Sequence, residues 1–286
     1  MCRHLAYLGP VVSLREAIID PPFGLYRQAW APRMMRNSGT MNVDGFGAGW
    51  YADGDPVPAR YRNSGPIWAD PSFADLTRVT RTGALLAAVR DASAGTEPGA
   101  SASAPFGASR WLFSHNGALE GWPGTAAGLA AALSPLELLS LDARVDSALL
   151  WALTLKQLRD GAAPDDALAA VIGLLDQAGV SGRFNFLLTD GQVIAATTAG
   201  HTLFCRQGHE GGADHVTVAS EPADEDPAWT EIPDRSLVTA TASDVKVRSL
   251  PVPSEVTVDH AERVQHASFP AGMAATSSPD GRNPTS

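Results

Sequence analysis

The chain is poor in cysteine, in positive charge and in long apolar runs, and each shortage excludes a class of protein. Its 286 residues include only two cysteines, Cys2 and Cys205, which is too few for a disulfide scaffold and favours a cytoplasmic location. Lys and Arg number 21 against 31 Asp and Glu. Because phosphate binding needs clustered positive charge, we expect no nucleic-acid partner. No apolar run reaches the roughly 18 residues of a membrane span, and no signal peptide is recognisable, so we expect no membrane partner.

Patterns that bind metals and nucleotides are missing as well. The seven histidines are scattered, and no His/Cys pair has the spacing of zinc ligands. The glycine-bearing segment 42–50 lacks a Walker lysine, and its glycines do not match a dinucleotide fingerprint followed by a helix. We therefore expect no metal and no cofactor.

The apolar pattern predicts a block of strands, then helices, then strands again. The expected strands are 5–8 (ended by Gly9-Pro10), 46–51, 84–89, 110–113, 184–188, 193–197, 202–205, 216–219, 237–241 and 245–247. The expected helices are 14–19, 125–133, 143–159 with Asp142 as N-cap, and 165–178. Such a block order indicates the α+β class, with antiparallel sheets covered by helices.

Composition marks two segments that differ from this pattern. Residues 94–108 are rich in Ser, Ala, Gly and Pro, which is typical of a surface loop. From about position 251, Pro, Ser, Asp and Gly dominate, and we interpret 252–286 as a disordered C-terminal tail without a catalytic part. The remaining residues, 2–250, are expected to form a single domain.

Cys2 directly follows the initiator methionine. Methionine is usually removed before a residue as small as cysteine, which would leave one residue with both a thiol and a free α-amine. That amine has a pKa of roughly 7.7–8.0, close to cellular pH, so it suits work as a general base. The alternative is that cysteine at this position carries no meaning, and position 2 by itself does not decide between the two.

Three further positions combine a reactive residue type with a suggestive place. Asn116-Gly117 follows a buried strand and offers two amide donors of the kind an oxyanion hole needs, although Asn-Gly is also the commonest hairpin turn. Arg90 ends a strand, where it could bind a carboxylate through two parallel hydrogen bonds or pair with Asp91 at the surface. Asp146 lies near the apolar face of the predicted helix, where it could bind an ammonium group or complement the helix dipole.

Taken together, these residues resemble the class II glutamine amidotransferases. The resemblance covers about residues 2–250. It is carried by Cys2 and, in the family's order, by Asp44-Gly45-Phe46-Gly47-x-Gly49-Trp50, Val89-Arg90-x-Ala92-Ser93, His115-Asn116-Gly117 and Val145-Asp146-Ser147. The resemblance implies a four-layer αββα sandwich of the N-terminal-nucleophile hydrolases in a single domain.

The resemblance also implies a role for each matching residue. Cys2 would be the nucleophile with its own α-amine as base, and Asn116 and Gly117 would form the oxyanion hole. Arg90 would bind the α-carboxylate of a glutamyl group, and Asp146 its α-ammonium. Ser93 stands where the family usually has Thr, which keeps the hydroxyl. Separately from the resemblance, the N-terminal half is rich in tryptophan, and Trp30, Trp50 or Trp68 could contact a cationic leaving group with an aromatic ring.

Longer stretches narrow the resemblance to members that hydrolyse a small-molecule γ-glutamyl amide. These stretches are residues 1–9, Pro21-Pro22, 27–33, 66–68 and 110–117; Phe23-Gly24, where a more polar pair is expected, departs from the pattern at a position relevant to the leaving group. One alternative is a glutaminase that supplies ammonia to a partner synthetase, although nothing after about residue 250 resembles a second catalytic domain. Two others are a glutathione-type γ-glutamyl hydrolase and a non-enzymatic binding module. The sequence does not indicate an oligomeric state.

Overall fold

A computed structural model describes residues 2–34, 41–93 and 95–250. These residues form two sheets in which every strand pair is antiparallel. The first has the order β11-β9-β10-β1-β4-β2-β3 and the second β13-β12-β8-β7-β6-β5. The strands of the first are β1 (Arg3–Ser13), β2 (Phe46–Trp50), β3 (Ala59–Asn63), β4 (Arg81–Val89), β9 (Phe204–Glu210), β10 (Ala213–Ala219) and β11 (Thr230–Glu231). Those of the second are β5 (Phe106–Ala108), β6 (Trp111–Leu119), β7 (Gly182–Thr189), β8 (Ile194–Thr198), β12 (Ser236–Ala240) and β13 (Val245–Ser249).

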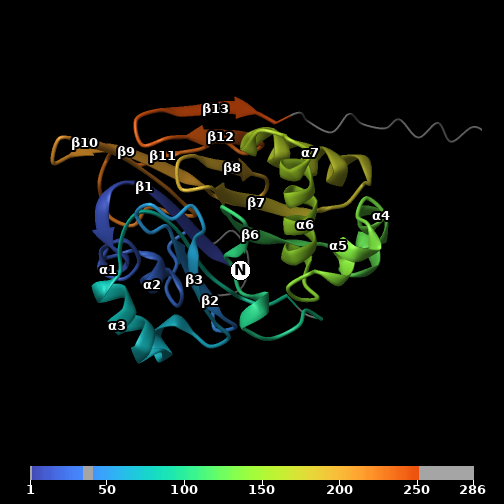
Figure 1. Ribbon diagram of the computed structural model, residues 1–286, viewed down its shortest axis with the longest axis horizontal. Helices are drawn as coiled ribbons and strands as arrows, with labels where there is room; N and C mark the ends of the chain where they lie inside the picture. The colour runs from blue at the N-terminus through green and yellow to red at the C-terminus, as the bar shows by residue number, and fades with distance from the viewer. Residues whose placement is uncertain (1, 35–40, 94, 251–286) are drawn as a thin grey trace, which may run out of the picture. The chain divides into compact units, whose positions relative to one another are not determined.

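Helices cover the outer face of each sheet (Figure 1). The first sheet carries α1 (Leu14–Ile18), α2 (Leu25–Gln28) and α3 (Pro71–Val79), and the second carries α6 (Asp146–Arg159) and α7 (Pro164–Gln177). The other helical segments are α4 (Ala127–Ala130), α5 (Pro135–Leu139) and the short 3-10 turns η1 (Ile67–Ala69), η2 (Ala100–Ala102) and η3 (Gly124–Ala126). The layers therefore run helix, sheet, sheet, helix, which confirms the α+β class and the four-layer αββα arrangement.

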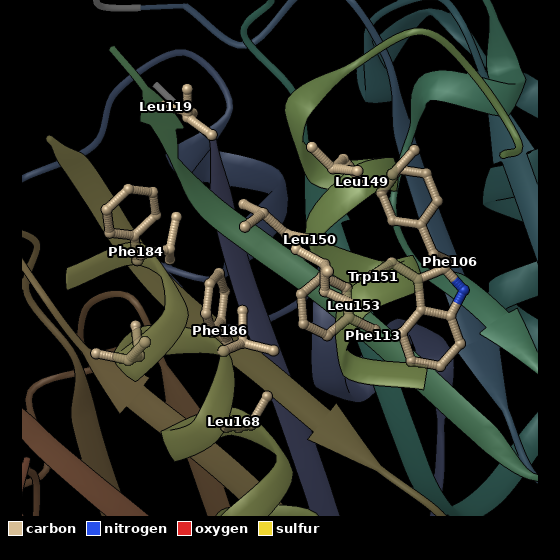
Figure 2. Packing of buried hydrophobic residues seen from close by; sticks show 14 of the residues in the cluster. Phe106, Phe113, Leu119, Leu149, Leu150, Trp151, Leu153, Leu168, Phe184 and Phe186 are labelled. Atoms are coloured by element: carbon tan, nitrogen blue, oxygen red, sulfur yellow. The ribbon is translucent and has the colours of Figure 1, made fainter. Parts of the chain in front are cut away.

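Each pair of adjacent layers encloses its own apolar core. Alternating strand residues produce this division because successive side chains point to opposite faces of a sheet. On the outer face of the second sheet, Phe113, Phe184 and Phe186 pack against Leu150 and Leu153 of α6 (Figure 2). Full burial of a side chain of this size contributes about 1.5–3 kcal/mol, so these contacts fix α6 firmly on its sheet.

The space between the two sheets changes from apolar to polar along the strands. At one end Leu8 of β1 packs in the same cluster as Leu112 of β6. Toward the start of β1, the inward position is His4, whose Nδ1 lies 3.1 Å from Ser114 Oγ. The next inward position of β6 is Asn116, which is completely buried. Buried polar groups need partners, so this end of the sandwich is organised by hydrogen bonds and not by apolar packing.

Most strands are longer than the sequence predicts, β1 and β6 most of all. The strand expected to end at Gly9-Pro10 continues to Ser13 as β1, and the ladder to β4 shifts register between Leu8 and Val12. Pro10 lies in that irregular stretch, where its missing N–H breaks no regular ladder bond. The Asn116-Gly117 turn considered above is also wrong, because β6 runs through both residues to Leu119.

Two other local predictions are wrong for tertiary reasons. Residues 94–108 are not simply a surface loop: they contain η2 and β5, and Phe106 is completely buried in the core beneath α6. Asp142 is not the N-cap of the long helix, which begins at Asp146 after Val145. Asp142 instead forms an ion pair with Arg62, 3.0 Å away. The predicted tail, 252–286, lies outside the described residues.

The described helices show no candidate for a transmembrane segment, since none is both long enough and apolar enough to cross a bilayer.

Candidate active site

A small cavity of about 30 Å³ lies beside Cys2 and is lined by most of the predicted site residues. Its lining includes Cys2 before β1, Arg90 after β4, Gly117 in β6 and Asp146 at the start of α6, together with Ser93. These residues are far apart in the sequence. The fold therefore brings a thiol, a guanidinium group and a carboxylate together in one cavity.

The register of the first sheet places the thiol next to the guanidinium group. Arg3 of β1 pairs with Val89 of β4, so the antiparallel ladder brings Cys2 opposite Arg90. Cys2 is half-buried, and its Sγ lies 3.8 Å from the carbonyl oxygen of Asp91. Burial raises the pKa of the Cys2 thiol above its ordinary value, while positive charges nearby, including Arg90, act in the opposite direction. The thiol is therefore protonated at neutral pH and needs a base to become a nucleophile.

Arg90 lies inside the protein and not at its surface, since its exposed fraction is 8%. Its guanidinium group donates to the carbonyl oxygens of Asp44 and Glu97 and to the hydroxyl of Thr96, at 3.1–3.2 Å. All of these acceptors are neutral. Among the contacts of the described residues Arg90 has no carboxylate partner, so a buried positive charge faces the cavity and is available for an anion.

Asp146 is a buried carboxylate at the first position of α6, with an exposed fraction of 6%. Its Oδ2 accepts from the backbone N–H of Leu119 at 2.9 Å, and its Oδ1 accepts from the N–H of Ser147 at 2.7 Å. The helix N-terminus adds favourable partial positive charge. Each carboxylate oxygen keeps a further acceptor position, so Asp146 has capacity left for a cationic ligand.

Glycine is the one residue type that fits position 117 in β6. A Cβ at this position would overlap the backbone carbonyl of Arg183 on the neighbouring strand β7. Its lack of a side chain also leaves open the part of the cavity wall that Gly117 forms. A backbone N–H at such an open position can approach a bound carbonyl group, as an oxyanion hole requires.

Asn116 has its side chain on the opposite face of β6 and does not belong to the cavity lining. Its amide nitrogen donates to Ser220 Oγ at 3.2 Å, while its Oδ1 is buried without a hydrogen-bond partner in the described part of the chain. The amide therefore lies in the polar space between the sheets, next to Ser220. Its second N–H has no partner among the described residues and is free to donate to a ligand.

His115 and Ser147 also line the cavity, and the sequence argument gave neither of them a role. His115 Nε2 lies 2.9 Å from the carbonyl oxygen of Arg183, and Nδ1 lies 3.0 Å from Ser147 Oγ. A carbonyl oxygen only accepts, so we assign the ring proton to Nε2 and the Ser147 proton to the bond with Nδ1. Burial lowers the pKa of His115. The ring is thus neutral with both nitrogens occupied, and it orients its neighbours instead of exchanging protons.

The tryptophans lie elsewhere. Trp50 pairs with Leu85, whereas Phe46 at the other end of β2 pairs with Val89, so Trp50 is at the end of the strand remote from Arg90. Trp30 and Trp68 pack edge to face with their ring centres 5.4 Å apart. None of the three tryptophans belongs to the cavity lining. Across the described ranges, no three His, Cys, Asp or Glu side chains gather in a way that could bind a metal ion.

Comparison with known proteins identifies the family. The model of the class II glutamine amidotransferases matches residues 24–211. The γ-glutamyl-hercynylcysteine sulfoxide hydrolase of Mycolicibacterium smegmatis is 39% identical over 250 residues, which cover 87% of this chain and 100% of that protein. The enzyme of the same name from Mycobacterium tuberculosis is 38% identical over 250 residues, covering 87% of this chain and 97% of that protein.

Solved structures show the same fold. A glutamine aminotransferase class-II domain protein from Silicibacter pomeroyi superposes with a TM-score of 0.64 at 23% identity, covering 88% of this chain and 100% of that one. The glutamine phosphoribosylpyrophosphate amidotransferase of Bacillus subtilis gives a TM-score of 0.56 at 15% identity. That match covers 87% of this chain but 49% of the amidotransferase. At these identities the likeness concerns the fold alone, which is that of the N-terminal-nucleophile hydrolases.

Proposed function

The chain belongs to the class II glutamine amidotransferase family, and from this premise we propose that it hydrolyses γ-glutamyl-hercynylcysteine sulfoxide to glutamate and hercynylcysteine sulfoxide. The observation that carries the proposal is the cavity in which Cys2 meets Arg90 and Asp146. The relatives of that name support the choice of substrate. The low cysteine content further supports a cytoplasmic setting.

Removal of Met1 precedes the reaction and frees the α-amine of Cys2. Because burial raises the pKa of the thiol, little thiolate exists at neutral pH before substrate binds. The α-amine, with a pKa of roughly 7.7–8.0, is at least about half unprotonated near pH 8 and takes the thiol proton. Nucleophile and base thus belong to one residue and need no second titratable side chain.

The thiolate attacks the δ-carbonyl carbon of the glutamyl group. As the C–S bond forms, the carbonyl oxygen becomes negatively charged and is stabilised by the N–H of Gly117 and the side-chain amide of Asn116. Loss of one donor of this kind typically raises the barrier by about 2.7–4 kcal/mol. Collapse of this intermediate breaks the C–N bond, and the protonated α-amine gives its proton to the leaving amine. Water then hydrolyses the thioester, which releases glutamate and regenerates the thiol.

Recognition of the glutamyl group depends on two charges at the other end of the cavity. Arg90 binds the α-carboxylate, and Asp146 binds the α-ammonium group. Each is more than nine-tenths buried, so each interaction is stronger than a surface ion pair. The Ser93 hydroxyl, at the exposed edge of the same cavity, adds a hydrogen bond to the bound glutamyl group. Contact between Trp50 and the trimethylammonium group of the leaving group, hercynylcysteine sulfoxide, remains a prediction.

The direct test compares three substrates at equal concentration. Purified enzyme should hydrolyse γ-glutamyl-hercynylcysteine sulfoxide with a kcat/KM at least roughly tenfold above the values for glutamine and glutathione, since leaving-group contacts contribute to the transition state. Cys2→Ala should abolish all three activities. Preferred turnover of glutamine would indicate a glutaminase, and preferred turnover of glutathione a glutathione-type hydrolase; either result would refute the assigned substrate.

A further inference from the structure

The dipeptide Ser220-Glu221 lies against the start of β1, next to the candidate nucleophile Cys2. It follows β10, whose last residue, Ala219, pairs with Leu5 of β1. The backbone N–H of Ser220 bonds to the carbonyl of His4 at 3.0 Å, which continues the ladder by one residue. Ser220 and Glu221 are 0% and 1% exposed, respectively, and neither belongs to the cavity lining. They are thus buried polar residues without a role in the proposed chemistry.

Ser220 holds the amide of Asn116 in one orientation. Its Oγ accepts from the backbone N–H of His4 at 3.0 Å and from Asn116 Nδ2 at 3.2 Å, and it donates to the carbonyl of His4 at 3.3 Å. A hydroxyl group has one proton and two acceptor positions, so these three bonds use its whole capacity. Because its proton is engaged, Ser220 can only accept from Asn116. The amide nitrogen, and not the oxygen, must therefore point toward β1.

Glu221 forms a buried ion pair with Arg3, the residue next to Cys2. Glu221 Oε1 lies 3.1 Å from Arg3 Nε, and both side chains are 1% exposed. The guanidinium group of Arg3 also donates to the carbonyl oxygen of Cys2 at 3.4 Å. The carboxylate is therefore linked to the backbone of the nucleophile through a single side chain.

The same carboxylate anchors the segment that runs past the start of β1. Glu221 Oε2 accepts from the backbone N–H groups of Arg33 and Met34 at 2.6 and 3.0 Å. Arg3 donates to the carbonyl oxygen of Met34 at 3.3 Å. Cys2 and Met34 are thus both bound to one ion pair. The placement of Arg33 and Met34 therefore depends on Glu221.

We propose that Ser220 and Glu221 are positioning residues of this active site: Ser220 aims the Asn116 amide at the oxyanion, and Glu221, through Arg3, fixes Cys2 and the segment at Met34. The proposal rests on the proposed function for its turnover assays. A charged pair with both partners buried gives little net stability compared with apolar residues of the same volume. Its presence at this point is accounted for by the geometry that it imposes on the nucleophile.

The test of Ser220 uses its truncation to alanine. Ser220→Ala should lower kcat for the γ-glutamyl substrate by roughly tenfold or more, because a misaimed amide no longer stabilises the oxyanion, while KM changes by less than about twofold. Alkylation of Cys2 by iodoacetamide should keep its wild-type rate, because this reaction forms no oxyanion. The matched control is Thr82→Val. It removes a buried hydroxyl near the start of β4, at the end remote from Arg90, and should leave kcat unchanged.

The test of Glu221 uses the thiol itself. Glu221→Gln should change the rate of Cys2 alkylation and its pH dependence, and should lower kcat by roughly tenfold or more. Because one unpaired buried charge can prevent folding, the double variant Arg3→Met with Glu221→Met removes both charges and should fold with the same defects. Asp176→Asn is the control, since it breaks a remote ion pair with Arg235 and should alter stability alone.

The outcomes separate this inference from the proposed function. If Ser220→Ala keeps kcat within twofold of wild type, or if the folded Arg3/Glu221 double variant alkylates and turns over normally, the dipeptide is purely structural and the inference is wrong. If wild-type enzyme hydrolyses no γ-glutamyl amide, the proposed function fails, but the alkylation assay still decides whether Glu221 positions Cys2.

Discussion

At the scale of single residues, the candidate site depends on the reactive group that each side chain carries and on how burial limits the charge of that group. Burial raises the pKa of Cys2, so an unassisted thiolate is scarce and the proposed mechanism assigns the α-amine as its base. The sequence proposed Cys2, Arg90 and Gly117 through the family resemblance, and the structure brings the three residues to one cavity. The hydrogen bonds of Asn116 and His115 were not predictable from the sequence, since they involve Ser220 and Arg183, which are distant in the chain.

Gly117 provides the sharpest test at this scale. Gly117→Ala should destabilise the protein by about 2 kcal/mol or more, because its Cβ would overlap the carbonyl of Arg183 and force β6 away from β7. It should also lower kcat by roughly a hundredfold or more, because the displaced N–H no longer faces the oxyanion. Urea denaturation and steady-state kinetics measure the two effects.

The matched control for this substitution is Gly173→Ala in the interior of α7. Its added Cβ meets open space, so alanine should stabilise the helix by about 0.4–1 kcal/mol and leave activity unchanged. Equal stability and kcat for Gly117→Ala and wild type would contradict the placement of Gly117 against β7.

At the scale of elements, the end of β4 and the start of α6 supply the two buried charges of the proposed glutamyl site. The sequence predicted both elements, because their apolar patterns are regular. It placed the helix start three residues too early and ended β1 at Gly9-Pro10, since local signals at Asp142 and Pro10 gave way to tertiary contacts. Asp142 is used by an ion pair with Arg62, and Pro10 lies where the ladder is irregular.

Arg90→Lys tests the guanidinium at the end of β4. Lysine keeps the charge but loses the planar fork, so KM for the γ-glutamyl substrate should rise by roughly tenfold or more. A substrate analogue without the α-carboxylate should be hydrolysed equally slowly by both proteins. Steady-state kinetics with the two compounds provide the measurement.

The control is Arg235→Lys, which makes the same change in an ion pair with Asp176 outside the cavity and should leave KM unchanged. If Arg90→Lys lowered turnover of both compounds by the same factor, the loss would be structural, and carboxylate binding by Arg90 would be refuted.

At the scale of the whole molecule, the polar end of the inter-sheet space makes stability depend on pH. His201 is almost fully buried, and burial, reinforced by the charge of Arg183, lowers its pKa from 6.5 to about 3. Burial also lowers the pKa values of His4 and His115. Below pH 6.5 these histidines bind protons in the unfolded chain but stay neutral in the folded protein. The free energy of unfolding therefore falls as the pH drops from 6.5 toward 3.

His201→Gln should reduce this acid sensitivity. The variant keeps an acceptor for Arg183 but has no group that titrates, so the slope should decrease by about 1.4 kcal/mol per pH unit in this window. Urea denaturation of both proteins between pH 6.5 and about pH 4 measures the slopes. An identical pH dependence in the two proteins would show that His201 is not held neutral.

The account as a whole depends on a glutamyl thioester at a free N-terminal Cys2. Rapid acid quenching of enzyme mixed with γ-glutamyl-hercynylcysteine sulfoxide, followed by peptide mass spectrometry, measures it most directly. The expected result is a first peptide that begins at Cys2 without Met1 and carries one glutamyl group on sulfur. Retention of Met1 in fully active enzyme, or complete turnover by Cys2→Ala, would contradict the mechanism.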